Sequence, residues 1–221
     1  SLVEKGHQIE VLTGKPNYPG GKVFDGYKAL GIQSEVYNGV KINRIPLISR
    51  GNSFFRIALN YLCFVISGLL FAPWALRKKK YDLIYVYCTS PIFQAIPAIF
   101  LGWIKGVPVV LWIQDLWPES LSGTGHIKNK AVLKLVEIIV RIIYKNVDLL
   151  LVQSLAFIAP VKNLAASTPV KYYPNSVSPI FVNPPKISVP IISGLTDGFS
   201  VMFSGNIGHA QSVEVIIAVS Y

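Results

Sequence analysis

The sequence predicts an α/β fold with a parallel sheet, and two observations carry that prediction. Short apolar segments alternate along the chain with longer segments of helical period, which is the pattern of parallel strands joined by crossover helices. One of the short segments, 107–114 (VPVVLWIQ), is almost continuously apolar, as expected of a strand covered on both faces of its sheet. We therefore expect helices on both faces, and ligand-binding residues in the loops that follow the strands.

The elements can be assigned in order along the chain. Residues 7–13 alternate between apolar and polar side chains and predict a strand, and 14–27, rich in Pro and Gly, predict a loop. Helices are predicted at 53–76, where a basic run follows, at 91–105, which Gly106 ends, and at 128–146. The remaining predicted strands are 40–47, 81–88, 107–114, 148–153, 170–173 and 199–204.

The composition is both apolar and basic. Of 221 residues 52% are hydrophobic and only 14% are charged, with a net charge of +10, whereas a typical soluble domain has about 25% charged residues. This composition excludes a disordered chain and a collagen-like one. A buried α/β core, a nucleic-acid binder and a protein on an anionic membrane remain. The basic residues gather at the ends and along single stripes of apolar helices, so nucleic acid is not the expected partner.

Motifs for metal or phosphate chemistry are not found. Cys63 and Cys88 lie in apolar runs and are predicted to be buried free thiols, and no Cys/His spacing suggests a metal. The loop 14–23 fails the phosphate-loop pattern, because Pro16 and Val23 stand at two of its required positions. The dinucleotide G-x-G-x-x-G and the G-x-S-x-G elbow are also absent from the sequence.

The helix over 53–76 contains 19 uncharged residues, 58–76, and at 1.5 Å per residue this stretch is about 28 Å long, close to the thickness of a bilayer core. A membrane span would place the strands at 40–47 and 81–88 on opposite sides of the membrane, so they could not share a sheet. A buried crossover helix or an in-plane membrane helix fits better. Arg56 and the run at 77–80 suit anionic headgroups, although a solvated helix end explains them equally well.

The helix over 128–146 carries its charged residues on one stripe, at spacings of three and four. An ordinary half-buried helix with a charged outer stripe explains this pattern, and the basic face of a membrane-surface helix is the alternative. The stripe consists of Lys130, Lys134, Glu137, Arg141 and Lys145.

Polar residues follow two of the predicted strands. Asp115 can accept a hydrogen bond from a sugar hydroxyl, and Glu119 can cap the next helix or act as a base. The alternative is that Asp115 only caps a turn while Trp117 packs. Asn175, after the strand at 170–173, can cap a turn or bind across a cleft.

The last part of the chain reads as a second domain. Residues 179–190 hold four prolines, and a strand, a Gly loop and a helix follow from 199. Gly205 and Gly208 would let a ligand approach the backbone closely at the N-terminus of the predicted helix, which is a favourable position for a diphosphate. We predict a domain at 1–178, a Pro-rich linker at 179–197 and the start of a second domain at 198–221. Both ends fall inside elements, so we expect a fragment of a longer chain.

Several of these motifs together resemble a known family. The set DLWPES after an apolar strand, YPNSV before the Pro-rich stretch, SGNIGHAQSVE and the early NYPGGKVFDGY is similar to the family-4 glycosyltransferases, especially the WbuB-like branch of bacterial polysaccharide and O-antigen synthesis. The resemblance covers essentially the whole chain. It implies the GT-B fold of two Rossmann-like domains that face a cleft, with the acceptor bound by the N-terminal domain and the nucleotide-sugar donor by the C-terminal one.

The resemblance also implies site residues and partners. It implies retaining transfer of a hexosyl or N-acetylhexosaminyl group from a nucleotide-sugar, such as a UDP-sugar, to a lipid-linked saccharide, without a metal or a separate cofactor. It would place Asp115 near the transferred sugar, so we predict Asp115, together with Glu119 as a candidate base, to be catalytic. The protein would be cytoplasmic and peripheral at the inner face of the plasma membrane, in contact with anionic lipid through 53–80 and 128–146. The donor would contact Gly205, Asn206, Gly208, Gln211 and Asn175, and the acceptor Tyr18, Gly20, Gly21 and Lys22.

The chain departs from the family pattern at Gln114, where many relatives have His. The family's acidic E-x7-E segment and its donor-binding basic residues would lie beyond Tyr221. The fragment is therefore expected to be inactive alone. Two other functions remain open: a non-catalytic α/β binding domain on the membrane, and a Rossmann enzyme that modifies sugar nucleotides.

Overall fold

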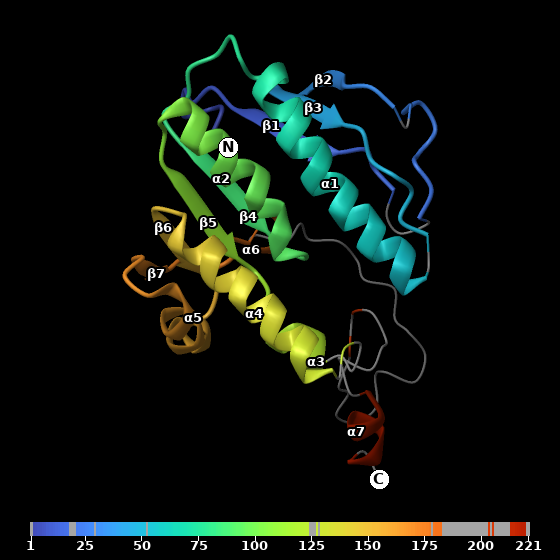
Figure 1. The fold of residues 1–221 in the computed structure, drawn as a ribbon, viewed down its shortest axis with the longest axis vertical. Coiled ribbons are helices and arrows are strands. Elements are labelled where there is room, and N and C mark those ends of the chain that lie inside the picture. Colours follow the sequence, from blue (N-terminus) through green and yellow to red (C-terminus); the bar gives the residue numbers. More distant parts are fainter. Residues whose placement is uncertain are drawn as a thin grey trace.

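A computed structural model of the chain shows two β-sheets lined by long helices (Figure 1). Its first sheet holds β1 (Glu10–Gly14), β2 (Gln33–Tyr37) and β3 (Val40–Ile45), in the order β1-β3-β2. The described residues are 2–17, 21–28, 30–51, 53–123, 127, 129–177, 179–182, 203, 205 and 213–219.

The hairpin in this first sheet was not predicted. Strand β2 pairs antiparallel with β3, whereas β1 and β3 are parallel, so the sheet is mixed rather than wholly parallel. The turn between β2 and β3 is Asn38-Gly39, and both residues have positive φ, of 47° and 78°. Asn-Gly is the preferred pair for such a turn, because both central residues need a left-handed conformation. The Asn-Gly turn was therefore visible in the sequence, but the segment before it was too polar to be recognised as a strand.

The second sheet confirms the predicted parallel βα pattern. It consists of β4 (Ile84–Cys88), β5 (Val109–Ile113), β6 (Leu149–Val152) and β7 (Val170–Tyr172), in that order and all parallel. Crossover helices join the strands: α2 (Ala95–Lys105), preceded by the short 3₁₀ helix η1 (Ile92–Gln94), α4 (Lys130–Lys145), and α5 (Ile158–Ala165) after the 3₁₀ helix η2 (Leu155–Phe157).

The strands predicted at 40–47 and 81–88, which are β3 and β4, were expected to share one sheet, but they lie in two. Among the described residues, no backbone hydrogen bond joins a strand of the first sheet to a strand of the second. Side chains make the connection instead. The Glu10 carboxylate accepts from Tyr81 Oη at 2.6 Å and pairs with Lys79 Nζ at 2.9 Å, just before β4.

The hydrophobic core lies between the parallel sheet and its helices. Leu111 and Leu150 of the strands are fully buried against Val140 and Tyr144 of α4. The opposite face is more open: Tyr85 and Tyr87 of β4 are 46% and 53% exposed beside Trp112. The expected burial of both faces therefore holds for most of β5 but not for β4.

Helix α1 (Phe54–Ala75) crosses from β3 to β4 and lies beside α2 (Figure 1). It begins at Ser53, whose Oγ accepts from the Arg56 amide at 3.3 Å, a standard N-cap. Gly68 allows the two helices to approach, because a Cβ there would stand 2.6 Å from Cγ of Pro97. The predicted helix is confirmed, and Gly106, with φ of 64°, ends α2 as expected.

Three short helices complete the described chain: α3 (Glu119–Gly123), α6 (Pro179–Val182) and α7 (Val213–Ala218). Helix α6 occupies the first four residues of the predicted linker. Of the strand predicted at 199–204 only Phe203 is described, so that strand and the domain boundaries remain predictions.

Candidate functional site

Polar side chains tie together the carboxyl ends of three parallel strands. Gln153, after β6, donates from Nε2 to the carbonyl oxygen of Gln114, after β5, at 2.8 Å. Asn175, after β7, donates from Nδ2 to Oε1 of Gln153 at 2.6 Å. The Gln114 side chain is buried, and its Nε2 has no hydrogen-bond partner among the described residues. The edge where ligands bind in such sheets is thus lined with amides.

The residues after β5 differ in their exposure: Trp117 is buried, whereas Asp115 and Glu119 are accessible to solvent. Trp117 packs, as the alternative interpretation held: it is buried, donates from Nε1 to Ser90 Oγ at 3.1 Å and meets the edge of Phe93. Asp115 is half-buried directly after this strand. Glu119 is exposed at the start of α3 and lines a cavity of about 470 Å³ that Glu137 of α4 also lines. Asp115 does not line that cavity, so the two predicted catalytic carboxylates are not brought together there.

A separate cavity of about 340 Å³ lies at the carboxyl ends of β1, β3 and β4, and we call it the Lys15 cavity. Its size is at the lower end for ligand pockets, about 300–1,000 Å³. The described side chains that line it include three cations and no carboxylate. The lining comes from Thr13, Gly14, Lys15, Pro16 and Asn17, from Arg44, Leu47 and Arg50, from Asn60, Tyr61 and Phe64 of α1, and from Ser90, Pro91 and Gln94.

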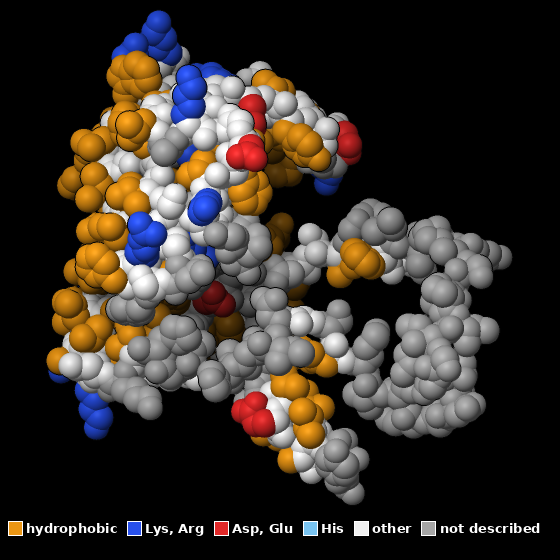
Figure 2. All heavy atoms as spheres, turned by 90° about the vertical axis from the view of Figure 1, so that its right-hand side faces the viewer, with side chains coloured by type: hydrophobic (Ala, Val, Ile, Leu, Met, Phe, Trp, Pro, Cys, Tyr) orange, Lys and Arg blue, Asp and Glu red, His pale blue; other side chains and the backbone are white. Residues whose placement is uncertain are grey.

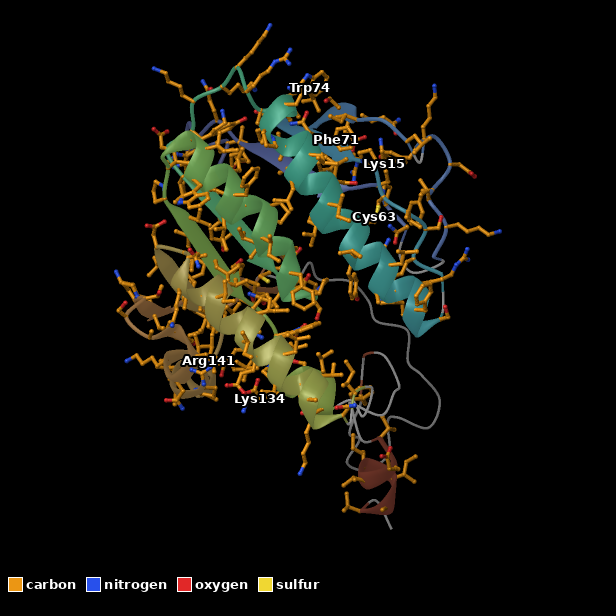
Figure 3. The ribbon with its side chains drawn as sticks, viewed as in Figure 1. Lys15, Cys63, Phe71, Trp74, Lys134 and Arg141 are labelled. Atoms are coloured by element: carbon orange, nitrogen blue, oxygen red, sulfur yellow. The ribbon has the colours of Figure 1, made fainter. Side chains whose placement is uncertain are left out.

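Lys15 itself is the central cation of this cavity. Its side chain is among the largest fully buried ones, with 1% of the residue exposed, and its Nζ donates to Oε1 of Gln33 at 2.5 Å. Burial lowers the pKa of Lys15 from its usual value, and the Arg44 charge lowers it further, while Glu35 offsets part of the effect. In Figure 3, Lys15 and Cys63 lie on the same side of α1. Sequence reasoning missed Lys15, although its position directly after a strand was a usable signal.

The predicted acceptor-binding residues are placed only in part. Gly21 is buried with φ of 75°, and its amide donates to the carbonyl of Asn17 at 2.7 Å. A Cβ at Gly21 would stand 3.0 Å from the amide nitrogen of Gly51, so this glycine lets two loops cross. Lys22 is exposed and does not line the Lys15 cavity. Tyr18 and Gly20 lie outside the described residues.

Most of the predicted donor site is not described. Gly205 is described, whereas Asn206, Gly208 and Gln211 lie outside the described residues, so the donor contacts stay predictions. Within the described part of the chain, no three His, Cys, Asp or Glu side chains gather as metal ligands would. Burial raises the pKa of the Cys88 thiol to about 12, so this cysteine, buried as predicted, is no thiolate nucleophile.

The parallel sheet, its crossover helices and the polar strand ends define the chain as a Rossmann-like α/β protein, a fold consistent with the N-terminal half of a GT-B enzyme. The chain is 28% identical over 227 aligned residues to WcaI of Escherichia coli (strain K12), which is described as a colanic acid biosynthesis glycosyl transferase. That similarity covers 98% of this chain and 55% of WcaI, so the chain spans about half the length of this relative. No protein-family model matches the chain.

Proposed function

We propose that the protein is a glycosyltransferase of bacterial cell-surface polysaccharide synthesis. One observation carries this proposal: the similarity to WcaI extends over almost the entire chain rather than over a single motif. A Rossmann-like fold with polar strand ends is compatible with it, but such folds serve many chemistries and do not select one. The family-4 and WbuB-like assignments, suggested by the motifs DLWPES and SGNIGHAQ, belong to the same proposal.

The proposed reaction moves a sugar from a nucleotide-sugar, with UDP as the nucleotide, to a lipid-linked saccharide, with retention and without a separate cofactor. Asp115 is the favoured side chain for the transferred sugar, because it is half-buried at the end of the central strand β5. Asn175 lies at the same edge, two strands away along the sheet. Gly205 and the residues after it are proposed to bind the donor diphosphate.

The membrane part of the proposal is supported by an exposed apolar surface, which we call the apolar band. Its residues on α1 recur every three or four positions, and parallel rows lie on α2 and α4. Trp103 of α2 is 84% exposed. The band consists of Phe55, Leu59, Leu62, Ile66, Leu70 and Trp74 of α1, Phe100, Trp103 and Ile104 of α2, and Val132, Leu135, Ile138 and Ile142 of α4.

Figure 2 shows hydrophobic side chains in a column along its left-hand edge, with Lys and Arg at both ends of the column. This edge is the face turned toward the viewer in Figure 1, where α1, α2 and α4 lie. Exposed apolar patches this extensive mark contact sites in soluble proteins, and flanking cations favour anionic lipid. We therefore propose peripheral contact with the inner face of the plasma membrane through this side.

Helix α1 is long and apolar enough to cross a bilayer by length and composition alone. Only 22% of its most apolar window is buried, so the interpretation as a fully buried crossover helix does not describe it. Its inner face nevertheless packs on the protein, through the buried residues Asn60, Ser67 and Ala72. An in-plane helix, with one face on the protein and the other in the lipid interface, accounts for both observations.

The test uses the full-length protein with bacterial membrane lipids as the acceptor source and a panel of radiolabelled UDP-sugars. Transfer of label into the lipid fraction, with the anomeric configuration read by NMR, is the expected result. Label released only as free sugar, or a nucleotide-sugar converted without transfer, would favour a sugar-nucleotide-modifying enzyme. Membrane binding with no consumption of any donor would favour the non-catalytic binding domain.

A further inference from the structure

Gln153 uses both ends of its side-chain amide to bridge two segments of the chain. It stands directly after β6 and is half-buried. Its Nε2 donates to the carbonyl oxygen of Gln114 at 2.8 Å, and its Oε1 accepts from Nδ2 of Asn175 at 2.6 Å. The orientation of this amide is fixed, because a flipped amide would set Oε1 against the carbonyl oxygen and Nε2 against another donor.

The first bridged segment is the end of β5, next to Asp115. Backbone pairing of β5 with β6 ends one residue before Gln114, and the Gln153 side chain takes the place of the next backbone contact. The amide of Gln114 donates to the Cys88 carbonyl of β4 at 2.9 Å. Gln114 is therefore held from both sides, and its carbonyl belongs to the peptide bond that leads to Asp115.

The second bridged segment is the chain that leaves β7 toward the predicted linker. Tyr173 donates from its amide to the Val152 carbonyl at 2.8 Å, and its own carbonyl accepts from Nε1 of Trp112 at 2.9 Å. Asn175, two residues further on, makes the hydrogen bond to Gln153. The chain after β7 is thus tied to β5 and β6, and Gln153 is the side chain that contacts both bridged segments.

We propose that Gln153 is a positioning residue, which holds Asp115 in the place that sugar transfer requires and links that place to the chain that enters the linker. This inference rests on the proposed function and adds to it a residue that acts through Gln114 rather than on the substrate itself. Small displacements of a reacting group are costly in catalysis, so the residues that support such a group contribute to the rate.

Two variants of the full-length protein separate the two hydrogen bonds. Gln153→Glu keeps the size of the side chain and the oxygen that faces Asn175, but an ionised carboxylate cannot donate to the Gln114 carbonyl. Asn175→Asp removes the other hydrogen bond at an exposed residue, where a substitution should leave folding intact. Gln8→Glu is the matched control, because it makes the same change of charge at an exposed glutamine away from these hydrogen bonds.

Steady-state transfer is measured for each protein between about pH 5 and pH 8. At the upper end, Gln153→Glu should lower kcat about tenfold with the acceptor KM unchanged, since a hydrogen bond is lost and the carbonyl then faces a charge. As the pH falls, the introduced carboxyl group becomes protonated and can donate to Gln114 again, so kcat relative to wild type should recover. Asn175→Asp should lower kcat about threefold, because Gln153 keeps its bond to Gln114.

A double variant tests whether Gln153 acts through Asp115. Asp115→Asn removes the carboxylate, so adding Gln153→Glu to it should lower kcat by less than about twofold. An undiminished tenfold loss in the double variant would show that Gln153 does not act by positioning Asp115, and would overturn the proposal. A loss in Gln153→Glu that does not recover at low pH would also overturn it, because a merely structural defect does not depend on one proton.

Hydrogen–deuterium exchange of the full-length protein gives a measurement that does not depend on activity. The amides of 111–117 and 171–177 should exchange faster in Gln153→Glu than in wild type, and exchange in Gln8→Glu should match wild type. Unchanged exchange in both segments would overturn the link between them. If the wild-type protein transfers no sugar from any donor, the proposed function fails, and the exchange measurement still decides whether Gln153 holds both segments.

Discussion

Glu10 is held by four polar partners at the junction of the two sheets. Its carboxylate is 5% exposed, pairs with Lys41 and Lys79, and accepts from Tyr81 and from Nδ2 of Asn43 at 2.8 Å. Burial by itself would raise the pKa of Glu10, but the hydrogen bonds from these partners outweigh it and lower the pKa to about 2. The ionised carboxylate therefore stabilises the fold.

Glu10→Gln should lower the free energy of unfolding by about 2–4 kcal/mol at pH 7, because a buried ion-pair network loses its charge. A carboxyl group with a lowered folded pKa contributes stability above its unfolded pKa, and this contribution is lost as the pH falls. Wild-type stability should thus decline between about pH 5 and pH 2, and Glu10→Gln should lack that part of the decline. Urea titrations at several pH values measure both effects.

Glu137→Gln is the control for this experiment. Glu137 pairs with Arg141, one turn further along α4, at 2.8 Å, but both side chains are exposed. Such a pair contributes only about 0.3–0.5 kcal/mol. Equal losses in the two variants would show that the Glu10 network is no stronger than an exposed helix pair.

Asp115 is the residue on which the proposed chemistry depends most. Asp115→Asn should lower kcat about a hundredfold, a typical loss for a positioned carboxylate, with little change in melting temperature. Glu119→Gln should cost less, because Glu119 is exposed and lines a cavity that Asp115 does not line. Steady-state transfer by the full-length variants measures both. A larger loss at Glu119 would reverse this assignment and direct attention to the cavity between α3, α4 and α5.

At the scale of elements, helix α1 shows how one small residue controls packing. An alanine normally favours a helix over glycine by about 1 kcal/mol. At Gly68 the added Cβ would stand 2.6 Å from Pro97 of α2, and such overpacking costs about 1–3 kcal/mol.

Gly68→Ala should therefore lower the melting temperature, although alanine has the higher helix propensity, because the added methyl group pushes α1 away from α2. Gly123→Ala in α3 is the matched control, because a Cβ there meets nothing within 4 Å. Thermal unfolding by circular dichroism compares them. A Gly68→Ala protein as stable as wild type would mean that the two helices separate without cost.

The sequence predicted these elements well where local signals were strong. The order of the long helices and parallel strands, the helix over 53–76 and the end of α2 at Gly106 were all predicted correctly, because each depends on neighbours within one or two turns. The hairpin β2–β3 was missed, because QSEVY has few apolar residues and only the Asn38-Gly39 turn marks it. Predicted strands also began up to three residues early, as with β1.

At the scale of the whole molecule, the apolar band and the basic residues around it predict binding to anionic vesicles. The structure refines which cations to change. Lys79 pairs with Glu10, so it is structural, whereas Lys78 and Lys80 are exposed in the same run. Neutralising all four residues at 77–80 would confuse lipid binding with folding.

Lys78→Gln with Lys80→Gln should weaken binding of the full-length protein to phosphatidylglycerol vesicles about tenfold or more, since each basic residue contributes about 1 kcal/mol. Trp103→Gln should weaken it on neutral vesicles as well, because its contribution is apolar. Lys171→Gln on β7 is the control for net charge. Sedimentation with vesicles measures all four proteins, and undiminished binding of the first two variants would contradict a lipid-facing band.

The sequence by itself determined the alternation of strands and helices, the end of α2 at Gly106 and the amphipathic stripes, because these depend on residues close together along the chain. It also placed Asp115 and Asn175 at strand ends. Only the tertiary structure decided which distant residues meet. Glu10 and Tyr81 are 71 positions apart, and the Lys15 cavity draws its wall from β1, β3, α1 and the loop after β4. Such meetings depend on strand register and helix packing, which no local pattern specifies.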